Sequence, residues 1–225
     1  MNRRTEMLHS LAESLIEVQD CHPLRVAIDG ITASGKTTLG NELTSAITER
    51  GRPVIRIRMD DFHHRREHRY RQGKDSARGY YDDAYDFDTL NQQVLRPLGP
   101  NGNLEFRRRI IDLASDTPIV EPAELATSDS ILIADGSFMQ RHHRRSWDVV
   151  IFVNTGFDEA LRRGSARDAE QFGGHAEAEQ RYAHRYHAAS HMYIDEVDPI
   201  HAADFIIDND DPSSPQLYRS ARDWN

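Results

Sequence analysis

Short apolar runs alternate with amphipathic stretches along most of the chain. Five runs rich in β-branched residues are too short to be helices, which predicts strands; they cover residues 24–28, 54–59, 131–134, 149–153 and 205–207. Runs that are apolar throughout are typical of a parallel sheet covered on both faces. The pattern therefore predicts an α/β fold with a five-stranded parallel sheet between layers of helices.

Apolar residues spaced three or four apart predict the helices around this sheet. Residues 5–19 have the spacing of an amphipathic helix, and residues 39–47 predict a second helix that Gly51 would end. Residues 88–95 and 176–193 carry helical patterns as well. The helices and strands alternate along the chain, as they do in a three-layer α/β fold.

A long polar insert separates the second and third predicted strands. It covers about residues 63–128, and its pattern predicts a hairpin that pairs residues 104–113 with residues 118–120. The tail from Asn209 contains two prolines, and we expect it to be loose. The length suits one domain, so we expect residues 1–225 to form a single domain.

Composition narrows the class of function. A net charge of −9 argues against a protein that coats nucleic acid, whose binding face would be basic. The single cysteine, Cys21, excludes an internal disulfide and fits a reducing cytosol. The chain has neither the apolar segment of a secretory signal near its start nor a stretch long enough to cross a bilayer. We expect a cytoplasmic protein that binds neither nucleic acid nor membrane. The oligomeric state stays open, and a homodimer is one of the alternatives.

Residues 30–37 carry the strongest chemical signal, because they read G-x-x-x-x-G-K-T. The glycines let backbone N–H groups turn inward around phosphate oxygens, and the following helix adds its N-terminal dipole. Lys36 would reach the β- and γ-phosphates of ATP, and the Thr37 hydroxyl would ligate Mg²⁺. Lysine is informative here, since Lys36 and Lys74 are the only lysines among 28 basic residues. We predict a Mg-ATP site formed by Gly30, Ala33, Ser34, Gly35, Lys36, Thr37 and Thr38.

Two further motifs bear on the type of reaction. Asp135, which ends the third predicted strand and could hold Mg²⁺ directly or through water, is followed by glycine. Hydrolytic P-loop ATPases usually have a water-activating glutamate at that position. Neither lysine follows an asparagine, so the N-K-x-D motif that reads guanine does not occur. Both absences favour transfer to a bound alcohol over hydrolysis.

Asp60 and Asp61 end the second predicted strand. The carboxyl end of a strand beside the first one lies close to the γ-phosphate in this kind of fold. A carboxylate there can orient and deprotonate an attacking hydroxyl, so we predict that Asp60, or alternatively Asp61, is the catalytic base. The arginine-rich residues 65–71 that follow are interpreted either as a solvated face or as a sign that the acceptor carries phosphate or carboxylate. The histidine clusters are interpreted as surface residues.

Together, the P-loop, Met59–Phe62, Asp135–Gly136 and Arg167–Asp168 resemble the uridine kinase/phosphoribulokinase family of P-loop kinases. The resemblance implies the 2-3-1-4-5 strand order of nucleoside and nucleotide kinases, a helical lid at about residues 160–176 and an acceptor-binding insert. It also implies that Asp60 is the base and that Asp135 is the second carboxylate. Residues 80–88 resemble the uridine kinase segment that holds ribose, which would make Asp82 the ligand of the ribose hydroxyls and Tyr81 a neighbouring wall.

The lid and the insert complete the hypothesis. Arg163 and Arg167 lie four apart, so on a helix they share a face from which they could neutralise charge on the transferred group. Residues 110–116 lack the histidine and the aromatic ring with which uridine kinases read the base. We therefore expect an ATP- and Mg-dependent kinase for a nucleoside-like or other diol-bearing metabolite, uridine and cytidine being poor acceptors. The alternatives are a kinase for another sugar, vitamin or nucleotide-like alcohol, and a regulatory nucleotide-binding module that hydrolyses slowly.

Overall fold

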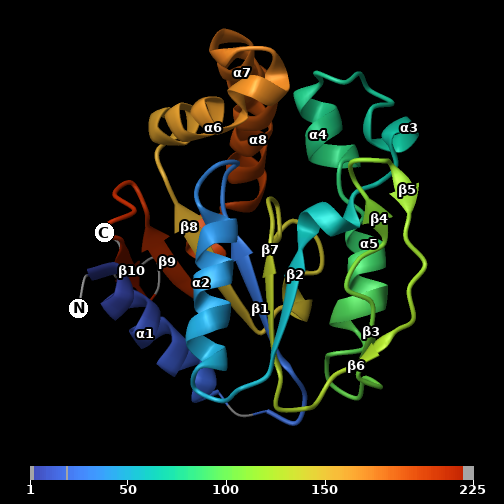
Figure 1. Ribbon diagram of the computed structural model, residues 1–225, viewed down its shortest axis with the longest axis vertical. Coiled ribbons are helices and arrows are strands. Elements are labelled where there is room, and N and C mark those ends of the chain that lie inside the picture. The colour runs from blue at the N-terminus through green and yellow to red at the C-terminus, as the bar shows by residue number, and fades with distance from the viewer. Residues whose placement is uncertain (1–2, 19, 220–225) are drawn as a thin grey trace.

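A six-stranded sheet forms the centre of the molecule, in the order β10-β9-β8-β1-β7-β2 (Figure 1). The computed structural model describes residues 3–18 and 20–219. The strands are β1 (Leu24–Asp29), β2 (Val54–Arg58), β7 (Ile131–Asp135), β8 (Val149–Asn154), β9 (Phe205–Asp208) and β10 (Gln216–Tyr218). The first five are parallel, and in chain order they follow the arrangement 2-3-1-4-5. The predicted α/β fold and its strand order are confirmed.

The tail from Asn209 was expected to be loose, and for residues 209–219 this prediction is wrong, while residues 220–225 lie outside the described residues. Asn209 is buried, and its side-chain amide donates a hydrogen bond to the carbonyl oxygen of Ser34 at 2.7 Å. Beyond it, β10 pairs antiparallel with β9, with Leu217 opposite Ile207. The two prolines that suggested a loose tail lie in the turn between these strands, where they interrupt no ladder.

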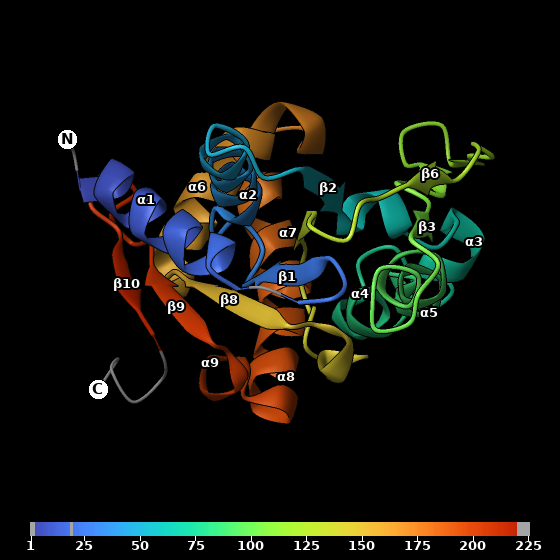
Figure 2. The same ribbon diagram turned by 90° about the horizontal axis from the view of Figure 1, so that it is seen from below.

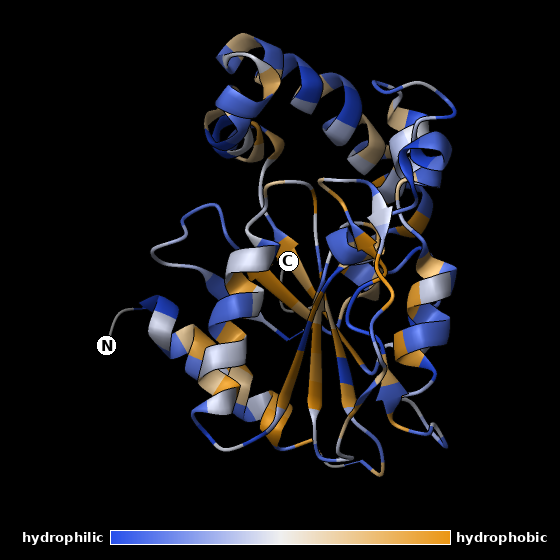
Figure 3. Ribbon diagram, turned by 45° about the vertical axis from the view of Figure 1, so that its right-hand side comes forward, coloured by the Kyte–Doolittle hydropathy of each residue, from blue (hydrophilic) through white to orange (hydrophobic). Residues whose placement is uncertain are grey.

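Helices cover both faces of the sheet. On one face, α1 (Arg3–Ile16) and α2 (Lys36–Thr48) pack together, and Figure 2 shows α8 (Ala188–Val197) and α9 (Pro199–Ala202) on the opposite side. Successive residues of a strand point to opposite faces, so Val26 and Ile28 join the apolar cluster under α1 and α2 while Ala27 joins the other cluster. This explains why most strand residues are apolar, and Figure 3 shows the strands as the hydrophobic centre of the fold.

The insert between β2 and β7 contains short elements. They are η1 (Met59–Phe62), α3 (Arg66–Arg69), α4 (Ala77–Asp83), α5 (Phe87–Leu90), η2 (Asn91–Leu95), β3 (Glu105–Phe106), β4 (Ile111–Asp112), β5 (Thr117–Pro118) and β6 (Glu124–Leu125). The predicted hairpin is confirmed only near its turn, where β4 pairs with β5. Residues 105–106 of its predicted first arm pair with residues 124–125 instead, as β3 and β6. The predicted helix over residues 88–95 corresponds to α5 and η2.

A helical arm stands above the carboxyl ends of the parallel strands (Figure 1). It consists of α6 (Phe157–Phe172), α7 (His175–Arg181), the π-helical segment η4 (Tyr182–His187) and α8, and the short η3 (Arg144–Ser146) precedes β8. The predicted helix over residues 176–193 is thus present, with a π-helical turn in its middle. Within residues 3–18 and 20–219, no helix is both long and apolar enough to cross a membrane.

Candidate active site

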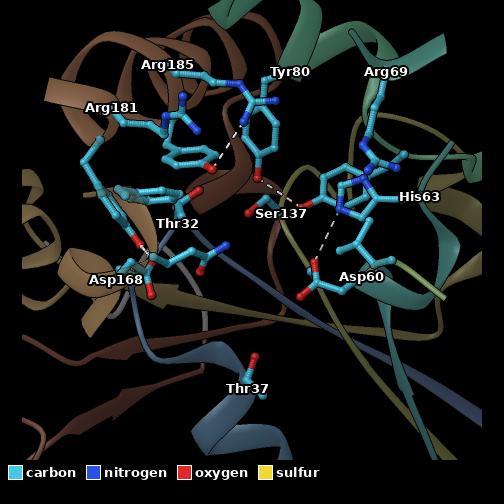
Figure 4. Close-up of a pocket in the computed structure, with 18 of the residues that line it drawn as sticks. Thr32, Thr37, Asp60, His63, Arg69, Tyr80, Ser137, Asp168, Arg181 and Arg185 are labelled. Carbon is cyan, nitrogen blue, oxygen red and sulfur yellow. Dashed lines mark hydrogen bonds and ion pairs between the residues drawn. The ribbon is translucent and has the colours of Figure 1, made fainter. Parts of the chain in front are cut away.

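A cavity of about 1050 Å³ lies at the carboxyl ends of β1, β2 and β7, below the helical arm. The P-loop and the segments after β2 and β7 form its floor, and the insert and the arm form its upper walls. Figure 4 shows side chains from all these segments pointing into the space between them. Segments far apart in the sequence therefore meet at one polar cavity, at the edge of the sheet where α/β proteins bind ligands.

The P-loop owes its shape to glycines and to two anchoring side chains. A Cβ on Gly30 would lie 2.6 Å from the carbonyl oxygen of Val153, so only glycine fits this close approach. The carbonyl oxygen of Ser34 accepts hydrogen bonds from the Thr155 hydroxyl at 3.2 Å and from the Asn209 amide at 2.7 Å. The ends of β8 and β9 thus hold the loop from behind, and sequence reasoning identified neither anchor.

Asp29 is a buried carboxylate directly before the P-loop. It accepts hydrogen bonds from the backbone N–H of Gly30 at 2.8 Å, from the Gln140 amide at 3.1 Å and from the Tyr193 hydroxyl. Burial raises its pKa above the usual value, although these hydrogen bonds oppose the rise. Asp29 thereby ties the start of the P-loop to the segment after β7 and to α8. Its position at the end of an apolar strand was the available signal, and sequence reasoning overlooked it.

The structure brings Lys36, Thr37 and Asp135 to the cavity floor. Lys36 is buried, and its Nζ donates a hydrogen bond to the carbonyl oxygen of Ile31 at 2.7 Å. Burial lowers the pKa of Lys36, while the charge of Asp135 works in the opposite direction. The Thr37 hydroxyl donates to Oδ2 of Asp135 at 2.5 Å, and the guanidinium of Arg56 contacts Oδ1.

This donor set fits Mg²⁺. The ion prefers oxygen ligands, often one or two from the protein with the remainder from water and substrate phosphates, and Thr37 and Asp135 offer a hydroxyl and a carboxylate oxygen side by side. In the part of the chain that the structure describes, no group of three or more histidine, cysteine, aspartate or glutamate residues forms a metal-binding arrangement. The interpretation of the histidine clusters as surface residues is wrong for two of their members, because His187 is buried and His63 lines the cavity.

Asp60 faces the cavity and Asp61 does not. The Asp60 side chain is 62% exposed, and its Oδ1 lies 3.6 Å from Nε2 of His63. Asp61 instead pairs with the guanidinium of Arg58 at 3.3 Å. The pKa of Asp60 lies below its usual value, because the attraction of His63 and of the charge of Lys36 outweighs the desolvation that would raise it. Of the two candidates for the base, only Asp60 is placed to act in this cavity.

His63 is a partner of Asp60 that sequence reasoning missed. Its Nδ1 lies 2.8 Å from the carbonyl oxygen of Ala84, which can only accept a hydrogen bond. Nδ1 therefore carries a proton, and Nε2 is the nitrogen that faces Asp60. Because the ring is held by the backbone and lies tilted against Tyr85, with the ring centroids 4.4 Å apart, the His63 side chain fixes one wall beside the carboxylate.

Gly136 lets the two carboxylate-bearing segments approach one another. A Cβ at this position would lie 2.3 Å from the Cβ of Met59, closer than two such atoms can come. With glycine there, the residue after Asp135 packs directly against the residue before Asp60. The two carboxylates consequently reach the same cavity from neighbouring strand ends.

The two arginines predicted for the lid have different positions. Arg167 lines the cavity and donates hydrogen bonds to Asp168 at 2.7 Å and to the Tyr182 hydroxyl at 3.0 Å. Arg163 does not line the cavity: it pairs with Glu159 and donates to backbone carbonyls of residues 209–210. The structure therefore supports a position at the site for Arg167 and gives Arg163 a role in holding the base of α6.

Tyr81 and Asp82, predicted to contact the acceptor, do not line the cavity. The Tyr81 ring lies under the guanidinium of Arg141, 3.7 Å from its carbon, and the Asp82 carboxylate pairs with Arg141 at 2.7 Å and also with Arg78. Successive helix residues point about 100° apart, and on α4 it is Tyr80 that faces the cavity. The expectation for Tyr81 and Asp82 has no support in this geometry.

Basic side chains line the walls farther from the floor. They are Arg66, Arg69, Lys74, Arg181 and Arg185. Two of them belong to the arginine-rich residues 65–71, so this segment is not simply a solvated face. Among these side chains, Arg69 is buried and pairs with Asp116 at 2.8 Å, and Arg181 pairs with Asp75 at 2.7 Å.

Comparison with known proteins places these observations in a family context. Residues 26–210 match the model of the phosphoribulokinase/uridine kinase family. A uridine kinase from Leuconostoc citreum (strain KM20) is 26% identical over 156 residues, which span 67% of this chain and 71% of the relative. Uridine-cytidine kinase B from Dictyostelium discoideum is 31% identical over 154 residues, 68% of this chain and 61% of the relative.

A similar structure has also been solved, that of a possible uridine kinase from Bacillus stearothermophilus. It superposes with a TM-score of 0.70 and 26% identity, covering 90% of this chain and 97% of the other.

Proposed function

The chain belongs to the phosphoribulokinase/uridine kinase family and is a kinase, and we propose that it transfers the γ-phosphoryl group of ATP to a hydroxyl of a small diol-bearing metabolite. The observation that carries the proposal is the placement of Asp60 in the same cavity as the P-loop residues Lys36 and Thr37. A carboxylate where the acceptor hydroxyl meets the γ-phosphate can act as the base of such a transfer, and Asp60 is the residue that we propose for this role.

In the proposed reaction, a bond forms between the acceptor oxygen and the γ-phosphorus while the bond to the leaving oxygen of ADP breaks. Asp60 orients the acceptor hydroxyl and takes its proton, which its lowered pKa allows because the carboxylate is ionised at neutral pH. Lys36 and Arg167 stabilise the negative charge of the phosphoryl group in transit. Thr37 and Asp135 would hold Mg²⁺, which neutralises charge on the β- and γ-phosphate oxygens when it is bound.

The acceptor is proposed to differ from uridine and cytidine. Leu113 and Ala114 are the hairpin residues that line the cavity, and neither side chain can hydrogen-bond to a pyrimidine or stack on one with a ring. Hairpin side chains that offer the base no polar partner select poorly among bases, since strong discrimination arises when buried groups would otherwise stay unpaired. The wall beside Asp60 is formed by Tyr80 and Tyr85, whose hydroxyls lie 3.0 Å apart and suit a hydroxylated molecule.

ADP release measured across a panel of acceptors tests the proposal. The panel contains uridine, cytidine, sugars, sugar acids and hydroxylated vitamins, each with Mg-ATP, and Lys36→Ala serves as the inactive control. We expect ADP formation to rise strongly with one class of acceptor and to stay low with the pyrimidine nucleosides. ADP formation that depends on Lys36 but that no acceptor changes would instead identify a nucleotide hydrolase.

A further inference from the structure

Arg185 is a buried cation in the wall of the cavity that the proposed reaction does not use. It lies on the π-helical segment η4 and is 6% exposed. The rings of Tyr80, Tyr186 and Tyr70 surround its guanidinium carbon at 4.8, 5.1 and 5.6 Å. Figure 4 shows Arg185 reaching down from the helical arm, with Tyr80 between it and the pair formed by Asp60 and His63. π-Helical turns of this kind occur frequently at functional sites.

No carboxylate compensates this charge. Within residues 3–18 and 20–219, Arg185 forms no ion pair, its Nη1 donates to the hydroxyl of Tyr186 at 3.2 Å, and its Nε has no hydrogen-bond partner. Three other arginines of the cavity each have a carboxylate: Asp116 for Arg69, Asp168 for Arg167 and Asp75 for Arg181.

An unpaired buried charge destabilises a fold, and three tyrosine faces recover only part of that cost. The arrangement is therefore typical of a cation held ready for an anionic ligand.

The neighbours of Arg185 place it on the acceptor side. Arg167 is the arm cation whose charge bears on Lys36 of the P-loop. Arg185 instead packs against Tyr70 and Tyr80, which belong to the insert. The Tyr80 ring lies 4.8 Å from the Arg185 guanidinium carbon, and Figure 4 shows Tyr80 between Arg185 and the pair formed by Asp60 and His63.

A molecule whose hydroxyl meets Asp60 would therefore extend along Tyr80 towards Arg185. At the far end, Lys74 lines the same cavity and, with Arg185, a smaller adjoining one of about 420 Å³. A second cation thus accompanies Arg185 at the end of the cavity away from the P-loop. Both positive charges face the space that the acceptor would fill.

We propose that Arg185 binds an anionic oxygen group of the acceptor, a carboxylate or a phosphomonoester, so that the substrate is a hydroxylated acid. The planar guanidinium matches either group with two parallel hydrogen bonds, and its free Nε supplies one of them. This inference rests on the proposed kinase function and adds the chemical class of the acceptor. It makes Arg185 a specificity-determining residue.

Three probes that differ in one group test this assignment: ribose, ribonate and ribose 5-phosphate. Steady-state kinetics with Mg-ATP are measured for the wild type, Arg185→Gln, which removes the charge, and Arg185→Lys, which keeps it. Arg181→Gln is the matched control, because Arg181 lies one turn earlier in the arm, lines the same cavity and already has a carboxylate partner. We expect one of the two anionic probes to be preferred over ribose, and the preferred one identifies the anionic group.

The expected signature is a change in preference. Loss of a buried charged contact should lower kcat/KM for the preferred anionic probe by about 10²-fold or more in Arg185→Gln, mainly through KM, with ribose changed little. Arg185→Lys should recover part of the loss, and Arg181→Gln should affect neutral and anionic probes alike. Equal losses for all three probes with a raised KM for ATP would show that Arg185 acts on the triphosphate and would overturn the inference.

A binding measurement makes the inference independent of turnover. Inorganic phosphate is titrated by calorimetry into protein whose P-loop is saturated with a non-hydrolysable ATP analogue. We expect the wild type to bind phosphate and Arg185→Gln to bind it about tenfold more weakly or worse. Equal binding by both proteins, or no binding by the wild type, would overturn the inference. The acceptor panel tests the proposed function separately. If no acceptor stimulated ADP formation, the proposed function would be contradicted, and the phosphate titration would still report on Arg185.

Discussion

Replacing Asp60 by asparagine is the perturbation that bears most directly on the catalytic base. The amide keeps the size of the side chain, but it carries no negative charge and cannot take the proton of the acceptor hydroxyl. The carboxylate is 62% exposed to the cavity and lies 3.6 Å from His63, so the change removes a charge from the site without opening a hole in the core. We therefore expect the fold to be retained and the chemical step to be lost.

The magnitude follows from what a positioned base contributes. General base catalysis typically accelerates a step by about 10²–10⁴-fold, equivalent to roughly 3–5 kcal/mol at the transition state. Asp61 offers a neighbouring control, because it does not line the cavity and its partner Arg58 is more than half exposed. A surface pair of that kind contributes about 0–1 kcal/mol, so Asp61→Asn should change kcat by less than about fivefold.

Single-turnover phosphotransfer separates the chemical step from ATP binding. We expect Asp60→Asn to slow the chemical step by about 10²–10⁴-fold while ATP binds as tightly as to the wild type, and Asp61→Asn to stay near the wild type in both. The assignment would be refuted by the reverse pattern, with Asp61→Asn inactive and Asp60→Asn active. Circular dichroism and thermal melting of both variants check that the comparison concerns folded protein.

Three further predictions concern the same floor of the cavity. Lys36→Ala should lower turnover by at least about 10³-fold without unfolding the protein, as steady-state kinetics and a thermal melt would show; near-normal turnover would place the site elsewhere. In the pH profile of kcat/KM, activity should fall on the acidic side at a pH below the usual pKa range of aspartate, because His63 holds the pKa of Asp60 down. His63→Gln should move this fall to higher pH; an unmoved profile would contradict the pairing of His63 with Asp60. Gly136→Ala should cost about 1–3 kcal/mol of unfolding free energy in a denaturant titration, since the new Cβ would lie 2.3 Å from that of Met59; an unchanged midpoint would contradict the close approach.

The sheet could be predicted because its strands are buried on both faces and therefore carry an unmistakable apolar pattern. The edge strand β10 could not be predicted, because it has only three residues, of which Gln216 is exposed and the other two are partly buried. What holds the tail is also remote in sequence: Asn209 bonds to Ser34, 175 positions away. A pattern that covers a few neighbouring residues contains no trace of such a contact.

The residues of the candidate site likewise separate into those that a local motif predicts and those that depend on contacts with distant segments. Lys36, Thr37, Asp60 and Asp135 were predicted from local motifs, and the structure brings all four to one cavity. Their assigned roles stay proposals. Arg167 joins them, as expected for a lid.

The contacts that tune these residues come from distant segments. Asp29 depends on Tyr193, and Asp135 on Arg56, each across more than 70 positions. No motif encodes these pairs. The pairing of β2 with β7 brings Arg56 to Asp135, and the position of α8 beside the end of β1 brings Tyr193 to Asp29.

Tyr81 and Asp82 illustrate why the acceptor side is harder to predict. A resemblance in sequence identified the right segment, but a helix turns each residue about 100° from the next. Tyr80 and Tyr85 face the cavity, and Tyr81 and Asp82 are engaged by Arg141 on another side of α4. Which face of a short helix meets the ligand depends on how the insert packs, and the apolar pattern of seven residues does not determine that.

The central claim is that the γ-phosphoryl group passes from ATP to an alcohol, and phosphorus NMR of the complete reaction tests it most directly. The enzyme is incubated with Mg-ATP and the acceptor that most stimulates ADP release, and the phosphorus-containing products are quantified together. The account predicts one phosphomonoester for each ADP, with no inorganic phosphate above the level of the Lys36→Ala control. Inorganic phosphate equal to ADP, with no phosphomonoester for any acceptor, would contradict it.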